Sequence, residues 1–61
     1  MLNETEKRVF IEVLEKMIKE YFDLCKECIY AGDPFGAEDA YAKECALREV
    51  LKKVKNDQAG S

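Results

Sequence analysis

Histidine and tryptophan are absent from this chain of 61 residues, and proline occurs once. Without histidine the chain can form neither a Ser/His/Asp nor a Cys/His catalytic arrangement, and the Glu-x-x-His pattern of di-iron bundles is excluded as well. A glycine-rich phosphate-binding loop is also missing from the sequence. We therefore expect a protein that is not an enzyme and that uses no cofactor.

Long apolar runs are missing too. The longest stretch without a charge, residues 28–32, is far too short to cross a bilayer, and the first six residues lack the apolar core of a signal peptide. Thirteen acidic and ten basic residues give a net charge of −3, without the basic excess that nucleic acid and anionic membranes demand. We expect a cytoplasmic protein that does not act at a membrane.

Cysteine occurs three times, and the odd number disfavours a closed disulfide framework. Cys25 and Cys28 form a C-x-x-C motif, and Cys45 lies where a hairpin would bring it near Cys25. Three cysteines are one ligand short of a structural zinc site, and the motif falls near the end of a helix, where the dipole disfavours thiolate. Cys25 and Cys28 are therefore predicted to be small buried apolar side chains. The weaker alternatives are metal binding by Cys25, Cys28 and Cys45, and redox or disulfide chemistry.

A capping signal opens the first helix. The Asn3 side chain can accept from the backbone N–H of Glu6, and the Glu6 side chain can bond back to the Asn3 backbone. No helix breaker follows until residue 32. The pattern predicts a helix over about residues 4–31.

Strong punctuation follows this helix. Gly32 suits the left-handed conformation that ends a helix, Asp33 can cap the next one, and Pro34 fits a first helical turn. A turn at residues 32–33 then predicts a second helix over about residues 34–55. So short a connection makes the two helices antiparallel neighbours.

Apolar residues on the first helix cover more than half of its circumference, which is wider than one partner helix can bury. This excess predicts an all-α fold in which residues 1–56 form a two-helix antiparallel hairpin, and in which two copies associate as a homodimer into a four-helix bundle. Residues 57–61 are predicted to be a disordered tail. The expected contacts between subunits are Phe10, Leu14, Met17, Tyr21 and Leu24.

Aromatic residues gather in sequence around the predicted turn, namely Tyr30, Phe35 and Tyr41. Exposed aromatic side chains are typical of contact sites between proteins, so these three are the candidates for binding a protein partner. The competing interpretation, which we favour, is that they pack on one another and close the end of the hairpin. The overall hypothesis is a small non-catalytic interaction or regulatory protein.

Basic residues at the end of the second helix support a different hypothesis. Arg48, Lys52 and Lys55 are spaced to share a face and, in a dimer, could contact the phosphates of RNA or DNA. In length, in its two helices and in its tight turn, the chain resembles the Rop-type plasmid copy-control proteins, and this resemblance of layout implies a dimeric four-helix bundle that binds RNA. Cations at a helix C-terminus also complement the helix dipole, and this is the more common reason for their presence there.

Glu44 falls close to the apolar stripe of the second helix. A carboxylate there must be paired or exposed. We expect it at an exposed edge of the stripe, with Arg48 as its neighbour one turn on. The alternative is that Glu44 fixes the register between the helices or receives a basic group from a partner.

Overall fold

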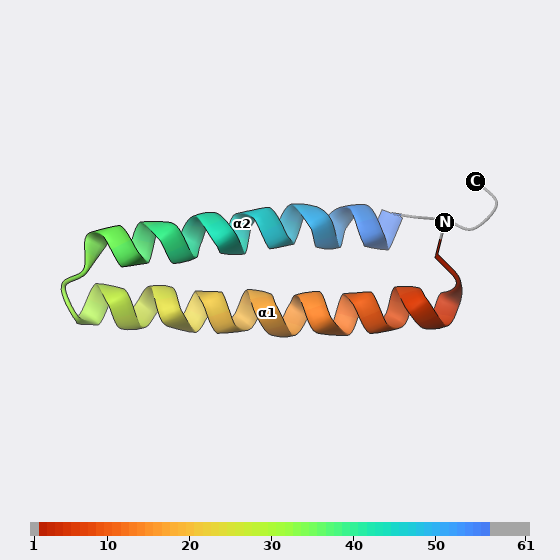
Figure 1. Ribbon diagram of the computed structural model, residues 1–61, viewed down its shortest axis with the longest axis horizontal. Helices are drawn as coiled ribbons and strands as arrows, with labels where there is room; N and C mark the ends of the chain where they lie inside the picture. The colour runs from red at the N-terminus through yellow and green to blue at the C-terminus, as the bar shows by residue number, and fades with distance from the viewer. Residues whose placement is uncertain (1, 57–61) are drawn as a thin grey trace.

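The computed structural model describes residues 2–56, which form two antiparallel helices joined by a tight turn (Figure 1). Helix α1 spans Glu4–Tyr30 and helix α2 spans Pro34–Asn56. The predicted all-α hairpin is confirmed, with helix ends one residue from the expected ones. The predicted tail, residues 57–61, lies outside the described residues.

Helix α1 begins with the capping box that the sequence indicated. The backbone N–H of Glu6 donates to Asn3 Oδ1 at 2.8 Å, and the backbone N–H of Asn3 donates to Glu6 Oε1 at 3.1 Å. Two N–H groups that would otherwise lack a helical partner are satisfied in this way. The acidic side chains of Glu4 and Glu6 in the first turn also complement the helix dipole.

A Schellman motif ends α1. Gly32 adopts a φ of 74°, its N–H donates to the carbonyl of Ile29 at 3.1 Å, and the N–H of Asp33 donates to the carbonyl of Cys28 at 2.8 Å. Only glycine takes this left-handed conformation without steric cost. The turn residue and its function are those that the sequence predicted.

Asp33 and Gly36 start α2 together. Asp33 Oδ1 accepts from the backbone N–H of Gly36 at 3.0 Å, which confirms Asp33 as the capping residue. A Cβ atom at position 36 would collide with the Asp33 carboxylate and would lie 3.0 Å from the Sγ atom of Cys28. Gly36 is therefore required by the close approach of the cap and of α1.

The core between the helices is thin. Its buried apolar residues are Leu14, Ala37 and Ala40, and Ala40 is only 1% exposed. Among the described residues no large side chain is completely buried.

Neither described helix combines the length and the apolar content needed to cross a bilayer. The Cα trace measures 48 × 16 × 9 Å, so the hairpin is a slab one helix thick.

Gly36→Ala should destabilise the protein, although alanine normally stabilises a helix by up to about 1 kcal/mol relative to glycine. The new methyl group displaces the Asp33 cap, and loss of such a cap costs about 1 kcal/mol. Urea unfolding at a fixed protein concentration measures the change. Ala42→Gly is the control at an exposed position of α2. It measures how much an alanine methyl group ordinarily adds to the free energy of unfolding in this helix. A gain in stability for Gly36→Ala that matches the loss for Ala42→Gly would contradict the steric role of Gly36.

Candidate interaction surfaces

An exposed apolar stripe runs along α1. Phe10, Met17 and Leu24 are spaced seven residues apart and are 50%, 37% and 44% exposed, and Val13 beside them is about as exposed. Residues seven apart lie on the same side of a helix, so the three side chains form one row. Helix α2 leaves this row uncovered.

The remaining two predicted subunit contacts are placed differently. Leu14 is buried against α2 and only 7% exposed, and Tyr21 is half-buried. Both line the boundary between the hairpin core and the exposed row. Leu14 therefore has little surface left to offer a second subunit.

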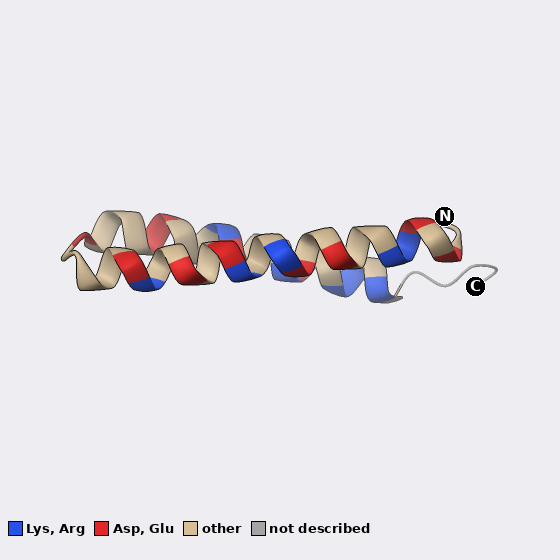
Figure 2. Ribbon diagram, turned by 90° about the horizontal axis from the view of Figure 1, so that it is seen from below, with Lys and Arg blue, Asp and Glu red and all other residues tan. Residues whose placement is uncertain are grey.

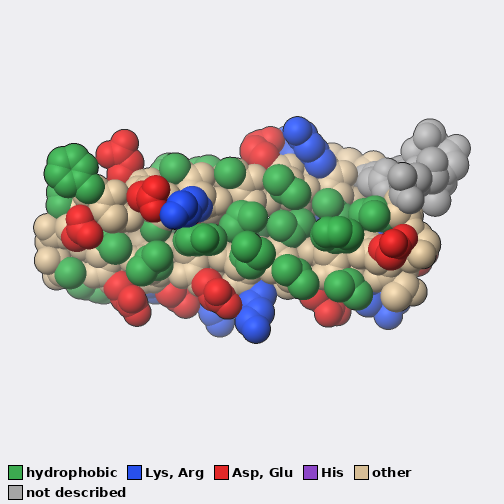
Figure 3. Space-filling view, viewed as in Figure 1, with side chains coloured by type: hydrophobic (Ala, Val, Ile, Leu, Met, Phe, Trp, Pro, Cys, Tyr) green, Lys and Arg blue, Asp and Glu red, His purple; other side chains and the backbone are tan. Residues whose placement is uncertain are grey.

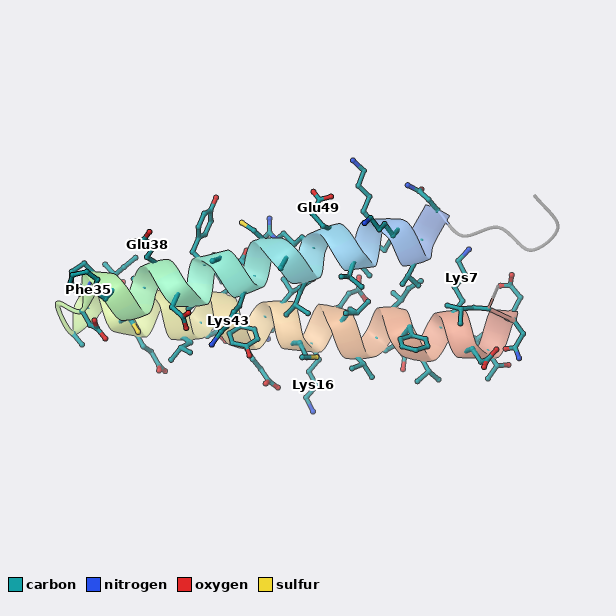
Figure 4. The ribbon with its side chains drawn as sticks, turned by 45° about the horizontal axis from the view of Figure 1, so that its top comes forward. Lys7, Lys16, Phe35, Glu38, Lys43 and Glu49 are labelled. Atoms are coloured by element: carbon teal, nitrogen blue, oxygen red, sulfur yellow. The ribbon has the colours of Figure 1, made fainter. Side chains whose placement is uncertain are left out.

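Helix α2 continues the same face. Lys43 Nζ lies 5.8 Å from the centre of the Tyr21 ring, so the Lys43 side of α2 adjoins the Tyr21 side of α1 (Figure 4). Val50 is seven residues from Lys43 and 46% exposed, which places it on that side too. Figure 3 shows apolar side chains gathered over both helices along the middle of this face, with most charged side chains at its edges and a few within the face. We name it the apolar face: Phe10, Val13, Met17, Leu24 and Val50.

Val13 and Val50 were not among the predicted contacts. The signal for Val13 was present in the sequence, since it lies one helical turn before Met17. Val50 could be assigned only once the orientation of α2 about its own axis was known. A hollow of ≈ 290 Å³ extends the face toward the start of α1 and is lined by Thr5, Glu6, Val9, Phe10 and Val13.

The aromatic residues near the turn do not pack on one another. Tyr30 is 88% exposed and Phe35 is 83% exposed, and Tyr41 is exposed as well. The favoured prediction, that they close the end of the hairpin, is therefore wrong. Tyr41 lies six residues from Phe35, which turns it to another side of α2. The end of the hairpin presents separate aromatic side chains, with no shared cluster.

Tyr41 lies one helical turn before Cys45 on α2. A hydrogen bond with Cys45, one turn on, raises the pKa of Tyr41 above its ordinary value, and the nearby Cys45 charge and partial burial act in the same direction. Tyr41 therefore remains a neutral phenol at physiological pH. The side chain is 59% exposed and available for contact.

The three cysteines are free thiols that do not converge on one point. Cys25 Sγ donates to the carbonyl of Ala37 at 3.4 Å. Cys45 lies eight residues beyond Ala37, about 12 Å along α2 at 1.5 Å per residue, so it is not the neighbour of Cys25 that the hairpin suggested. In residues 2–56 no three Cys, Asp or Glu side chains are placed to hold a metal ion.

Cys28 is half-buried beside the turn. Burial raises the pKa of its thiol, and the neighbouring Asp33 carboxylate raises it further. A raised pKa leaves less thiolate, the form that attacks electrophiles and binds metals. Cys25 and Cys28 are partly buried, as the apolar interpretation requires, although neither is fully enclosed.

The basic end of α2 does bring together the three residues of the nucleic-acid hypothesis. Arg48, Lys52 and Lys55 border a hollow of ≈ 300 Å³ together with Leu51 and Asn56. Two of the three cations are paired with carboxylates, Arg48 with Glu44 at 2.6 Å and Lys55 with Glu15 at 3.7 Å. Figure 2 shows acidic and basic residues interspersed along the helices. The positive charge of this end is thus partly neutralised.

Glu44 is buried, which makes the prediction of an exposed edge position wrong. It is 3% exposed and lies on the side of α2 that faces α1, in line with Ala37 and Ala40. The predicted pairing with Arg48 is confirmed. The Arg48 side chain reaches back from solvent, being 61% exposed, and neutralises the carboxylate from outside. The ion pair is therefore asymmetric, with one member in the core and one at the surface.

Comparison with protein families, with curated proteins and with solved structures found no match to this chain.

Arg48→Ala should destabilise the hairpin by on the order of 2 kcal/mol, because it leaves the Glu44 carboxylate nearly buried without its cation. Lys52→Ala, at an exposed neighbouring position that has no ion pair within the described chain, should cost less than about 0.5 kcal/mol. In the Glu44→Leu background the Arg48→Ala change should cost little, since no buried charge remains. Thermal unfolding of the four variants measures these differences. Equal effects of Arg48→Ala and Lys52→Ala would show that Glu44 does not depend on Arg48.

Proposed function

We propose that this chain is a non-catalytic interaction protein that acts as a homodimeric four-helix bundle, in a regulatory capacity, on a protein partner. The observation that carries the proposal is the apolar face, which a lone hairpin leaves in water. Phe10, Met17, Leu24 and Val50 are each more than a third exposed, whereas the buried apolar residues within the described range 2–56 are one leucine and two alanines. We expect this protein in the cytoplasm, where its thiols stay reduced.

Energetics favour association over a stable monomer. A domain of about 60 residues has little apolar surface to bury, and a single core of this size supplies only a few kcal/mol. Monomers rarely expose contiguous apolar patches larger than a few hundred Å², and larger patches are typical of protein contacts. Docking a second copy on the apolar face removes that surface from water and doubles the number of core residues.

The end of the hairpin is then what remains for another protein. Tyr30 and Phe35 extend into solvent next to the hydrogen-bonded Schellman turn. Aromatic side chains lose little conformational entropy on binding and dominate the energy of many interfaces. We propose Tyr30 and Phe35, with Tyr41 on the adjoining side of α2, as the residues that contact the partner.

Our first expectation is that the wild-type protein sediments as a dimer at micromolar concentration in reducing buffer. Met17→Asp should raise the dimer dissociation constant more than about tenfold, because it sets a charge in the centre of the apolar face. Phe22→Asp is the matched control: Phe22 is also about half exposed, but five residues on it lies on another side of α1.

Sedimentation equilibrium with circular dichroism of the same samples provides the measurement. A wild-type chain that melts cooperatively as a folded monomer would overturn the dimer. Equal weakening by Met17→Asp and Phe22→Asp would show that the apolar face is not the contact.

Our second expectation concerns the end of the hairpin. Affinity purification from the native host should recover a partner whose binding falls by more than about 1 kcal/mol in Tyr30→Ala or Phe35→Ala, with helicity and sedimentation unchanged. Reversal of charge at Lys52 and Lys53 serves as the comparison and should have little effect on a protein partner. The opposite ranking, with affinity that falls steeply as salt is added, would identify a nucleic acid as the ligand.

A further inference from the structure

The apolar row of α1 is symmetric about its middle residue. Phe10 lies seven residues before Met17 and Leu24 lies seven residues after it, and all three are exposed. In a two-fold contact residue i meets residue j of the partner while j meets i, so even spacing about the centre sets an apolar residue opposite an apolar residue at each level. An antiparallel pairing centred on Met17 satisfies this condition along the whole row.

The spacing also suits two helices packed side by side. Apolar residues seven apart stay on one seam when helices pack at the shallow angle of four-helix bundles. Centred on Met17, the pairing stacks Phe10 on the partner's Leu24 and Leu24 on the partner's Phe10. Each layer then combines one large and one smaller apolar side chain, or two methionines at the centre.

Charges beside the row agree with this arrangement. Lys16 and Glu20 lie near Met17, and in the described part of the chain neither forms an ion pair within its own hairpin. Antiparallel pairing about Met17 sets Lys16 and the partner's Glu20 about 3 Å apart along the helix axis, and by symmetry Glu20 and the partner's Lys16 as well. Two equivalent opposite-charge contacts would flank the centre of the interface.

The parallel alternative fits less well. In that arrangement the two turns lie at the same end of the bundle and α1 lies over the partner's α2. Each α1 residue is then level with the same α2 residues of the partner as of its own hairpin. Leu24 would then face the region of the partner's Lys43, whose equivalent in this chain holds Asp39 in an ion pair of 2.9 Å. In the antiparallel arrangement the region of Lys43 and Asp39 meets the partner's Val54 instead. Val54 is already half-buried in its own hairpin, so less exposed apolar surface is set against these charges.

The available area is adequate for a stable dimer. The Cα trace extends 48 Å by 16 Å in the plane of the slab, so the face offers on the order of 800 Å² per subunit, the share of one partner in a standard-sized interface. A second copy therefore suffices to cover it.

We propose that a second copy of this chain docks antiparallel on the apolar face, with Met17 at the two-fold axis and the two turns at opposite ends of the bundle. Gly32 lies fifteen residues from Met17, so the turns are about 45 Å apart at 1.5 Å per residue. This inference rests on the proposed dimer and adds its geometry. Aromatic side chains at both ends of a rod can engage two partner molecules at once, so the dimer is a bridging protein.

Cysteine crosslinking of the full chain tests the geometry. Met17→Cys should form a covalent dimer on mild oxidation with copper phenanthroline, seen as a doubled mass without reductant. Phe10→Cys and Leu24→Cys should crosslink when the two variants are mixed and allowed to exchange subunits. Oxidised alone, each variant should give no more covalent dimer than the wild type. The wild type, with its three native cysteines, provides the background.

A second measurement uses the unaltered sequence. In a dimer of one isotope-labelled and one unlabelled subunit, filtered nuclear Overhauser spectra should connect the Phe10 ring with methyl groups of the partner's Leu24. Contacts from Phe10 to the partner's Val54, together with failure of Met17→Cys to crosslink, would overturn the antiparallel arrangement even if the wild type sediments as a dimer. A wild type that sediments as a monomer would instead overturn the proposed function itself.

Discussion

Two helices joined by a turn of three residues can cover only one side of each other, and the remaining features of this molecule follow from that constraint. The contact side of α2 is built from Ala37, Ala40 and Glu44, all buried. Small side chains allow α2 to lie close to α1, but they span little of its circumference. The broad apolar surface of α1 is therefore only partly used within the chain, and its outer row stays in water.

The buried carboxylate shows how the hairpin accommodates a polar group in so thin a core. Removing the charge of Glu44 from water is costly, and Arg48 offsets the cost from the solvent side at 2.6 Å. Such a pair adds less stability than an apolar side chain would, but it restricts how α2 can turn about its axis. If α2 rotated about its own axis, Glu44 would move away from the side that faces α1. Its carboxylate would then lose its near-complete burial or its contact with Arg48. The pair thereby helps to fix which side of α2 adjoins Tyr21, and so the composition of the apolar face.

Local signals in the sequence were sufficient for the helices and the turn. Asn3, Glu6, Gly32 and Asp33 act through hydrogen bonds to residues three to five positions away, so their effect depends on nearby sequence alone. The width of the α1 apolar surface was equally visible, because periodicity reports which residues share a side.

Burial between helices was harder to predict, because it depends on the rotation of α2 and on helix separation. Glu44 appeared to lie at an edge, yet the close approach permitted by the alanines encloses it. Tyr30 and Phe35 appeared close enough in sequence to pack together, yet they leave their helices in different directions and remain in solvent. The prediction that Cys25 and Cys45 are neighbours was wrong for the same reason. The register of the helices sets Cys45 about two turns beyond the position opposite Cys25.

The proposed dimer contact and the proposed partner contact use different parts of the hairpin. Cations near the end of α2 are drawn into pairs with Glu44 and Glu15, which lowers the field available for attracting a polyanion. The apolar face has no such internal partner and lies along the slab, where only a surface of similar length can cover it. A second hairpin has that length, whereas a contact at the turn is short and suits a side chain entering a pocket. Self-association along the flank and recognition at the ends can therefore coexist, because neither uses the residues of the other.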